Sequence, residues 1–286
     1  MQKAKLALKT DVSHQSIIQI SDTVAVGGRD LLIVGGPCTV ENRAQMETVA
    51  SRLAIASVQA LRGGVYKPRT SPYDFQGLGI EGLEILAAVR DRYGMPVITE
   101  VMAISQIEEI AAYADVLQVG SRNMQNFDLL KALGQAHKPV LLKRGLAATI
   151  EEFVMAAEYI LSHGNPNVIL CERGIRSFDT YTRNVLDLGA VSALKQITHL
   201  PVIVDPSHAA GKRELVADLA RAAVACGADG IIVECHPEPE KSVSDARQAL
   251  SLDDMVALVQ SVKAIATAIG RSVPSAIEPL PQLALL

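Results

Sequence analysis

The sequence predicts an α/β protein, a closed (β/α)8 (TIM) barrel with a short β-hairpin extension at its N-terminus. The chain has 286 residues, 49% of them hydrophobic, which is the usual size of one such barrel. Eight short apolar runs alternate with segments of helical periodicity, as in parallel strands that are each followed by a helix. The first run leads into Gly35-Gly36-Pro37-Cys38, not the G-x-G-x-x-G turn of an open dinucleotide-binding sheet. The closed barrel is therefore favoured over an open sheet.

We expect three parts: an extension over residues 1–30, a barrel over 31–270 and a tail over 271–286. In the extension, residues 16–20 and 23–26 predict two short strands around the Ser21-Asp22 turn. The barrel strands are predicted at 31–34, 61–65, 96–99, 116–119, 139–142, 168–170, 202–204 and 230–233. The helices are predicted at 41–58, 78–92, 105–112, 127–133, 149–161, 184–195, 212–225 and 253–268.

Composition argues against several other classes of protein. The four cysteines follow no paired spacing, so a disulfide framework is not expected. The sequence shows neither a signal peptide nor an apolar run of about 18 residues, which predicts a cytoplasmic protein without a membrane span. A net charge of -4 with 3% aromatic residues gives little support for nucleic-acid binding. His14, His137, His163 and His199 fall outside the predicted strand ends and are interpreted as surface histidines.

Polar side chains, marked by Gly or Pro, follow all eight predicted strands, where the active site of such a barrel lies. Cys38, His208 and Glu234 follow the first, seventh and eighth strands, and Asp245 lies in the loop beyond the eighth. The first and eighth strands are neighbours in a closed barrel, so these four side chains predict a divalent metal site. Mixed S, N and O ligands suit Mn, Fe, Co or Zn, and the residues alone do not choose among them.

Simpler interpretations exist for single members of this set. Cys38 could be packed in the core, and Asp245 could cap a helix over residues 246–250. His236 is a competing metal ligand, ranked second to His208.

A second, cationic set lies at the ends of the second, fourth, fifth and sixth strands: Arg62, Lys67, Arg69, Arg122, Lys143 and Arg173, with Arg144 as a weaker candidate. Pro68 and Pro72 forbid regular helix in the basic stretch 62–73. The stretch is either a solvated turn or a rigid cradle for phosphate and carboxylate. Six cations at one barrel mouth favour substrates with several negative charges, although some could instead pair with Glu100, Glu172 or Asp205.

The motifs together resemble the 3-deoxy-D-arabino-heptulosonate 7-phosphate (DAHP) synthases, in the short microbial type called type I beta. They are Gly36-Pro37-Cys38, Lys67-Pro68-Arg69-Thr70-Ser71-Pro72-Tyr73, Gly120-Ser121-Arg122-Asn123-Met124-Gln125-Asn126, Asp205-Pro206-Ser207-His208 and Glu234-Cys235-His236-Pro237-Glu238-Pro239. The resemblance covers roughly residues 31–255. It implies a metal-dependent barrel that condenses phosphoenolpyruvate with erythrose 4-phosphate, the first step of the shikimate pathway to chorismate and the aromatic amino acids.

The resemblance also implies roles for residues. Cys38, His208, Glu234 and Asp245 match the family's metal ligands, with Mn the favoured ion. Arg62, Lys67, Arg122, Lys143 and Arg173 match its phosphoenolpyruvate contacts, with Gly120 and Ser121 beside Arg122. Pro68, Arg69, Thr70 and Ser71 match its erythrose phosphate site. Lys67, Cys38, His208 and Glu100 are the expected catalytic residues, Lys67 polarising the aldehyde and Glu100 orienting water.

Three other functions are weighed against this one. The sister enzyme, 3-deoxy-D-manno-octulosonate 8-phosphate synthase, uses arabinose 5-phosphate, but its loop reads Lys-Ala-Asn-Arg-Ser-Ser where this chain has Lys67-Pro68-Arg69-Thr70. A catalytically silent barrel that acts as a regulatory partner would not be expected to keep every ligand. An aldolase with a Schiff base on Lys143 would leave the metal set without a purpose.

Assembly and regulation are inferred from the resemblance alone. Barrels of this family form dimers or tetramers, so a homo-oligomer is expected. The residues before the barrel are too few for the family's N-terminal regulatory domain. We therefore expect little inhibition by phenylalanine or tyrosine unless a partner such as chorismate mutase supplies it.

Overall fold

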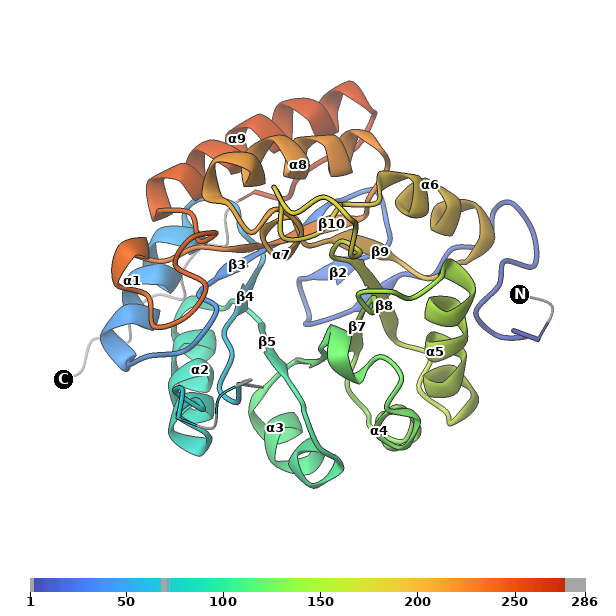
Figure 1. Cartoon of the computed structure of the whole chain (residues 1–286), viewed down its shortest axis with the longest axis horizontal. Helices are drawn as coiled ribbons and strands as arrows, with labels where there is room; N and C mark the ends of the chain where they lie inside the picture. The colour runs from blue at the N-terminus through green and yellow to red at the C-terminus, as the bar shows by residue number, and fades with distance from the viewer. Residues whose placement is uncertain (1–2, 68–70, 72, 276–286) are drawn as a thin grey trace.

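A computed structural model describes residues 3–67, 71 and 73–275 of the chain. Eight parallel strands close into a barrel in the order β10-β3-β4-β5-β6-β7-β8-β9, with helices around its outside (Figure 1). The strands are β3 (Leu32–Gly36), β4 (Ala60–Arg62), β5 (Val97–Glu100), β6 (Val116–Val119), β7 (Val140–Lys143), β8 (Val168–Glu172), β9 (Val202–Val204) and β10 (Gly230–Glu234). The predicted fold class is confirmed. The second strand is shorter than predicted and begins one residue earlier.

The helices of the described chain are α1 (Arg43–Ala54), α2 (Ile80–Tyr93), α3 (Ile107–Tyr113), α4 (Phe127–Leu133), α5 (Ile150–Ser162), α6 (Leu188–Ile197), α7 (Pro206–Ala210), α8 (Arg213–Ala225) and α9 (Leu252–Ala268). Helix α1 is shorter than the predicted 41–58, because Asn42 caps its first turn and Ser57 has a positive φ of 61°. Helix α7 was not predicted. It begins at Pro206, and the Asp205 side chain accepts a hydrogen bond from the His208 amide.

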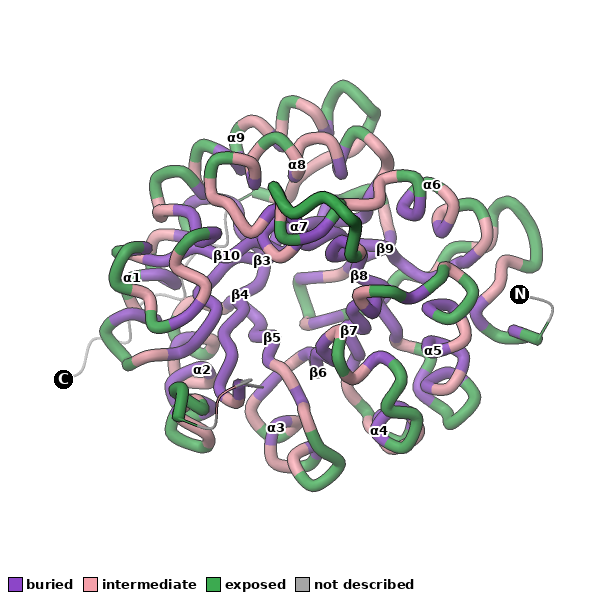
Figure 2. The backbone as a smooth tube through the Cα atoms, in the orientation of Figure 1, coloured by how far each residue is buried: buried purple, intermediate pink, exposed green. Residues whose placement is uncertain are grey.

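The predicted hairpin is present but shorter, with β1 (Ile18–Gln19) antiparallel to β2 (Ala25–Val26). Ile18, Ile20, Val24 and Val26 are buried in one apolar cluster with side chains from the barrel strands, among them Leu32. This cluster is separate from the larger core between the strands and the outer helices. Figure 2 shows the barrel strands as the buried centre of the molecule, with the exposed residues on the outer helices and on the loops. The hairpin therefore fills one end of the barrel interior and leaves the other end for a site.

The N-terminal arm lies against α5 and α6 on the outside of the barrel. The buried carboxylate of Glu158 accepts hydrogen bonds of 2.8–3.0 Å from the backbone N–H groups of Lys5, Leu6 and Ala7. His199 forms hydrogen bonds with the Leu6 carbonyl and the Ser16 hydroxyl. His199 is thus buried, and its interpretation as a surface histidine was wrong, because the arm covers it. No helix in the described part of the chain is long and apolar enough to cross a membrane.

Candidate metal centre and active site

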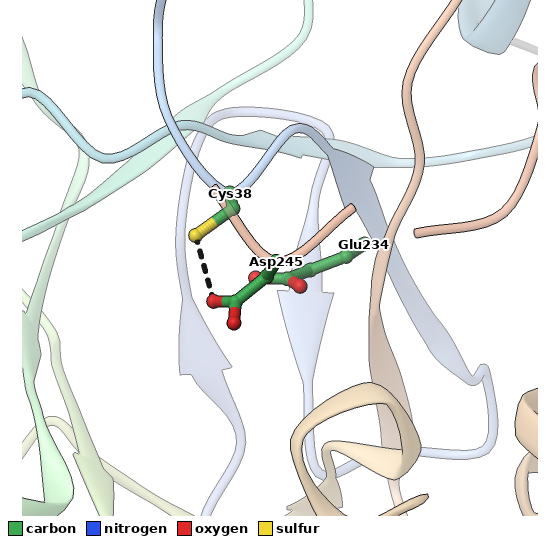
Figure 3. Close-up of side chains that lie close together, drawn as sticks. All are labelled: Cys38, Glu234 and Asp245. Atoms are coloured by element: carbon green, nitrogen blue, oxygen red, sulfur yellow. Dashed lines mark hydrogen bonds between the residues drawn. The ribbon is translucent and has the colours of Figure 1, made fainter. Parts of the chain in front are cut away.

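Three of the predicted metal ligands converge where β3 and β10 end. Glu234, the last residue of β10, is in register with Gly36 of β3, which places it beside the turn that carries Cys38. The Cys38 thiol lies 3.2 Å from Oδ2 of Asp245. Cys38, Glu234 and Asp245 each offer one ligand atom, and these three atoms all lie within 4.8 Å of one another. Figure 3 shows the three side chains pointing toward one another.

His208 reaches the same cluster from α7. Its Nε2 atom lies 3.4 Å from Oε1 of Glu234 and 3.9 Å from Oδ2 of Asp245. Its other ring nitrogen, Nδ1, lies 2.7 Å from Oδ2 of the buried Asp205. A carboxylate on one ring nitrogen orients the other toward a metal and is the usual arrangement around a metal-binding histidine. Sequence reasoning considered Asp205 only as an ion-pair partner, and the structure shows it orienting His208.

Burial and neighbouring charged groups shift the pKa values of two side chains in this cluster. Burial and the neighbouring Glu234 carboxylate raise the pKa of the Cys38 thiol to about 11. Burial also acts to raise the pKa of Asp245, but His208 and Arg183 outweigh it and lower the pKa to about 2. Oε1 of Glu234 is buried and makes no hydrogen bond among the described residues, although Nη2 of Arg62 lies 3.1 Å and Nε2 of His208 lies 3.4 Å from it. A sulfur, an imidazole and two carboxylates that converge at one point fit a divalent transition metal.

The competing sequence interpretations do not describe this site. Nδ1 of His236 accepts a hydrogen bond from the Glu238 amide, and its Nε2 faces Glu41 at 3.4 Å. Residues 246–248 form a turn and Leu250 forms a β-bridge with Cys235, so Asp245 has no helix there to cap. It instead adopts a left-handed backbone conformation with φ of 52°. His236 is therefore outside the cluster, and Asp245 is directed into it.

A cavity of about 360 Å³ adjoins the cluster at the strand ends, within the usual size range for small-molecule sites. Its lining includes Arg62, Lys67, Glu100, Gly120, Ser121, Arg122, Lys143, Arg173, His208 and Asp245. The structure thus brings most of the predicted substrate residues together. Ser71 is half-buried and is not part of this lining. Pro68, Arg69 and Thr70 lie outside the described residues.

The cations of the cavity differ in how far they are already paired. Arg62 and Arg173 are buried, and the Nη1 atom of each has no hydrogen-bond partner among the described residues. Arg62 also lies 3.1 Å from Glu234 through Nη2. Lys143 forms a buried ion pair with Asp205. Two buried guanidinium groups with free N–H donors are suited to bind an anion.

Two further cations, Lys67 and Arg144, differ in which groups they contact. Nζ of Lys67 lies 2.9 Å from both the sulfur and the carbonyl oxygen of Cys38, so it links the cavity to the metal cluster. Arg144 pairs with Glu172 at 2.8 Å and with Asp187 at 3.1 Å. Arg144 therefore has a structural role, the alternative considered for the cationic set.

Sequence reasoning missed five residues of the cavity lining: Gln118, Leu146, Arg176, Arg183 and Asn184. Gln118 belongs to β6, and its inward direction follows from the alternation of side chains along a strand. Leu146 lies in the loop after β7, and the other three lie inside the long loop between β8 and α6. No motif marked that loop, and Asn184 was predicted to begin a helix over 184–195 that in the structure begins at Leu188.

Fold and site together define a class: a (β/α)8 barrel with an anion-binding cavity beside a cluster of metal-ligand side chains. The sequence profile of the DAHP synthetase I family matches residues 9–270, and the chain belongs to that family. This confirms the resemblance seen in the motifs.

Relatives within the family carry two names. The chain is 50% identical to the phospho-2-dehydro-3-deoxyheptonate aldolase of Thermotoga maritima over 266 residues, which is 93% of this chain and 78% of that protein. It is 36% identical over 262 residues to the 2-dehydro-3-deoxyphosphooctonate aldolase of Geobacter sulfurreducens, covering 85% of this chain and 95% of that protein.

Two solved structures are similar over nearly the whole chain. The crystal structure of the Thermotoga maritima DAHP synthase superposes with a TM-score of 0.92 at 48% identity, over 96% of this chain and 80% of that one. A truncated form of the 3-deoxy-D-arabino-heptulosonate 7-phosphate synthase from Thermotoga maritima gives a TM-score of 0.88 at 46% identity, over 94% and 98% of the two chains.

Proposed function

We propose that this chain condenses phosphoenolpyruvate with D-erythrose 4-phosphate to give DAHP and inorganic phosphate, the first step of the shikimate pathway. The observation that carries the proposal is the contact between two chemical sets. Lys67 lies at once in the cation-lined cavity and 2.9 Å from the Cys38 sulfur of the metal-ligand cluster. A carbonyl bound at this junction would meet a metal site on one side and a bound polyanion on the other.

Cys38, His208, Glu234 and Asp245 would hold one divalent ion, with Mn favoured over Fe, Co and Zn. When bound, that ion supplies Lewis acidity for the aldehyde of the sugar. Asp205 keeps Nε2 of His208 directed toward the cluster. The convergence of ligand atoms from Cys38, Glu234 and Asp245 within 4.8 Å of one another supports this assignment most directly, because sulfur and carboxylate oxygens are ligands of such ions.

The other residues would bind the substrates and move protons. The free N–H groups of Arg62 and Arg173 would hold the phosphate and carboxylate of phosphoenolpyruvate, with Lys143 and Arg122 beside them. Lys67 would donate a hydrogen bond to the aldehyde oxygen while C3 of phosphoenolpyruvate attacks the aldehyde carbon. Water oriented by Glu100 would add at C2. The bond from C2 to the bridging oxygen then breaks, and phosphate leaves with that oxygen.

The phosphate of the sugar is assigned by resemblance only. Pro68, Arg69, Thr70 and Ser71 would bind it, and the first three lie outside the described residues. The four-carbon acceptor is supported by the Lys67-Pro68-Arg69-Thr70 motif and by the 50% identity to the heptonate enzyme against 36% to the octonate enzyme. Schiff-base chemistry on Lys143 is disfavoured, because its amine is already paired with Asp205.

The test is phosphoenolpyruvate consumption by metal-stripped protein, offered erythrose 4-phosphate or arabinose 5-phosphate, with and without added Mn. We expect rapid, metal-dependent consumption with the four-carbon sugar alone. A preference for arabinose 5-phosphate would assign the chain to the octulosonate enzymes. No consumption with either sugar would favour a silent barrel that serves as a regulatory partner.

We also propose a cytoplasmic homo-oligomer, either a dimer or a tetramer, that is little inhibited by phenylalanine or tyrosine unless a partner such as chorismate mutase supplies that control. These proposals are supported by the family resemblance. Light scattering of the purified chain gives the oligomeric state, and a single-chain mass would contradict the assembly.

A further inference from the structure

We propose that Arg183 is a positioning residue that holds both carboxylate ligands of the metal centre. The inference rests on the proposed metal site. Arg183 belongs to the loop between β8 and α6, far from Asp245 in sequence. Its Nη1 atom nevertheless lies 3.1 Å from Oδ1 of Asp245 and 3.1 Å from Oε1 of Gln248. One guanidinium nitrogen therefore connects the loop that follows β8 with the loop that follows β10.

The contact with Gln248 extends to Glu234. The amide oxygen of Gln248 accepts from Arg183, which leaves its Nε2 group to donate to Oε2 of Glu234 at 2.6 Å. Gln248 is buried, so a reversed amide would place its oxygen against the carboxylate at a high cost. Arg183 thus fixes which way the amide points. The amide in turn occupies Oε2 of Glu234, so the oxygen left to face a metal is Oε1, which makes no hydrogen bond among the described residues and lies 3.1 Å from Nη2 of Arg62.

The two carboxylate oxygens of Asp245 also have different partners, as those of Glu234 do. Oδ1 accepts from Arg183, and Oδ2 faces the Cys38 thiol and Nε2 of His208. Asp245 also has φ of 52°, a left-handed conformation that is uncommon outside glycine but that Asp tolerates better than most residues. Arg183 supplies a contact to the carboxylate from outside the cluster. Without it, Asp245 can relax away from the cluster.

Arg183 is itself anchored to the helix that carries the third ligand. Its backbone N–H donates to the Ala210 carbonyl, and the side-chain amide of Asn184 donates to the His208 carbonyl at 2.9 Å. Gly211 permits this approach, because a Cβ there would lie 2.5 Å from Cβ of Arg183. Arg183 and Asn184 therefore act on three ligands. Asn184 contacts the backbone of His208, and Arg183 contacts Asp245 directly and Glu234 through Gln248.

Positioning and simple charge predict opposite effects of removing Arg183. The guanidinium is a cation beside a cation-binding site, so its charge alone weakens metal binding, and neutralising it would tighten binding. A partner that orients ligands strengthens binding instead, and its loss typically weakens metal affinity by about 10–100-fold. The sign of the change in metal affinity therefore separates the two explanations.

The experiment is a titration of the metal-stripped full-length chain with Co²⁺, followed by the thiolate and d–d absorption bands, without substrates. We expect Arg183→Gln to bind Co²⁺ about 10–100-fold more weakly than the wild type and to show altered band positions. Arg183→Lys, which keeps an N–H donor, should recover part of the affinity. The matched control is Arg176→Gln, because Arg176 lines the same cavity and no ion pair joins it to a ligand among the described residues. Its affinity should stay within about twofold of the wild type.

Unchanged or tighter Co²⁺ binding by folded Arg183→Gln protein would overturn the inference about Arg183. In that case, Co²⁺ binding by the wild type with a thiolate band would still support the proposed metal site. Absence of that band in the wild type would overturn both. Circular dichroism establishes that each variant is folded, and Arg183→Lys gives the answer if the Gln variant is not.

Discussion

Gly120 is required by one neighbouring carboxylate rather than by its own backbone. It follows β6 with φ of -67° and ψ of 158°, which any residue can adopt. A Cβ at this position would lie 2.1 Å from Oε1 of Glu100 and 2.9 Å from its Cδ. Changing Gly120 to Ala therefore displaces the Glu100 carboxylate, the group proposed to orient the attacking water.

The expected loss of rate follows from the steric overlap between a Cβ at position 120 and the Glu100 carboxylate. The 2.1 Å approach is more than 1 Å short of the 3.4 Å at which ordinary van der Waals contact begins. Misplacement of a catalytic group by about 1 Å can cost about 100-fold in rate, or about 2.7 kcal/mol of activation free energy. Stability should change little, because the half-buried Glu100 can swing into the cavity and its bond to Gln118 is long, at 3.4 Å. The variant should thus be folded and slow.

The assay is phosphate release with saturating phosphoenolpyruvate, erythrose 4-phosphate and Mn, together with thermal unfolding. Gly145→Ala is the matched control, since Gly145 follows β7 and a Cβ there would lie 3.3 Å from Cβ of Ala148, a contact that needs little adjustment. We expect the control to keep its rate within about threefold. When Glu100 is already changed to Gln, changing Gly120 to Ala as well should lower the rate little further. Neighbouring substitutions that act through one group are not additive.

A folded Gly120→Ala protein that kept more than a third of the wild-type rate would refute the reasoning. In that case the position of the Glu100 carboxylate would not limit turnover, and the water would have to be oriented by another group.

Two further predictions concern the N-terminal arm. Glu158→Gln leaves one acceptor oxygen for the N–H groups of residues 5–7 and should lower the free energy of unfolding by about 2 kcal/mol. It should expose the arm to limited proteolysis at unchanged turnover, and an equally protected arm would contradict the proposed anchor. Burial, with a smaller effect of His14, lowers the pKa of His199 below its ordinary value of 6.5. As pH falls through 6.5, the unfolded chain therefore takes up this proton before the folded chain does, and stability declines. His199→Gln should lessen the loss of stability between pH 7.5 and 5, measured by urea unfolding, and an identical loss in both proteins would exclude His199 as its cause.

The periodicity of the sequence was sufficient to predict the barrel. Strands β6 and β9 and helix α4 have the predicted bounds, and other boundaries differ by a few residues. Strands that are buried on both faces appear as short continuous apolar runs, and amphipathic helices between them repeat every 3.6 residues. Helix α1 and strand β4 are shorter than predicted because of local backbone geometry, such as the positive φ of Ser57, which periodicity does not reveal.

The main residues of the site were also predictable, because a parallel barrel brings every strand end to the same rim. Cys38 and Glu234 needed only the adjacency of the first and last barrel strands. Asp245 was included from its place in the loop beyond the eighth strand, and the family resemblance matched it. The Lys67 contact with the Cys38 sulfur was beyond sequence reasoning, since the direction of a long flexible side chain depends on its neighbours.

The sequence by itself determined the barrel, its hairpin, the strand ends that carry the chemistry and the family. Only the tertiary structure decided that Asp205 orients His208, that Arg144 has a structural role, and that Arg183 reaches two carboxylate ligands through one nitrogen and an amide. The physical reason is that strands and helices repeat along the chain, whereas contacts between loops join residues that are far apart in sequence. Such contacts leave no periodic pattern, and they form only after the barrel has brought its loops together.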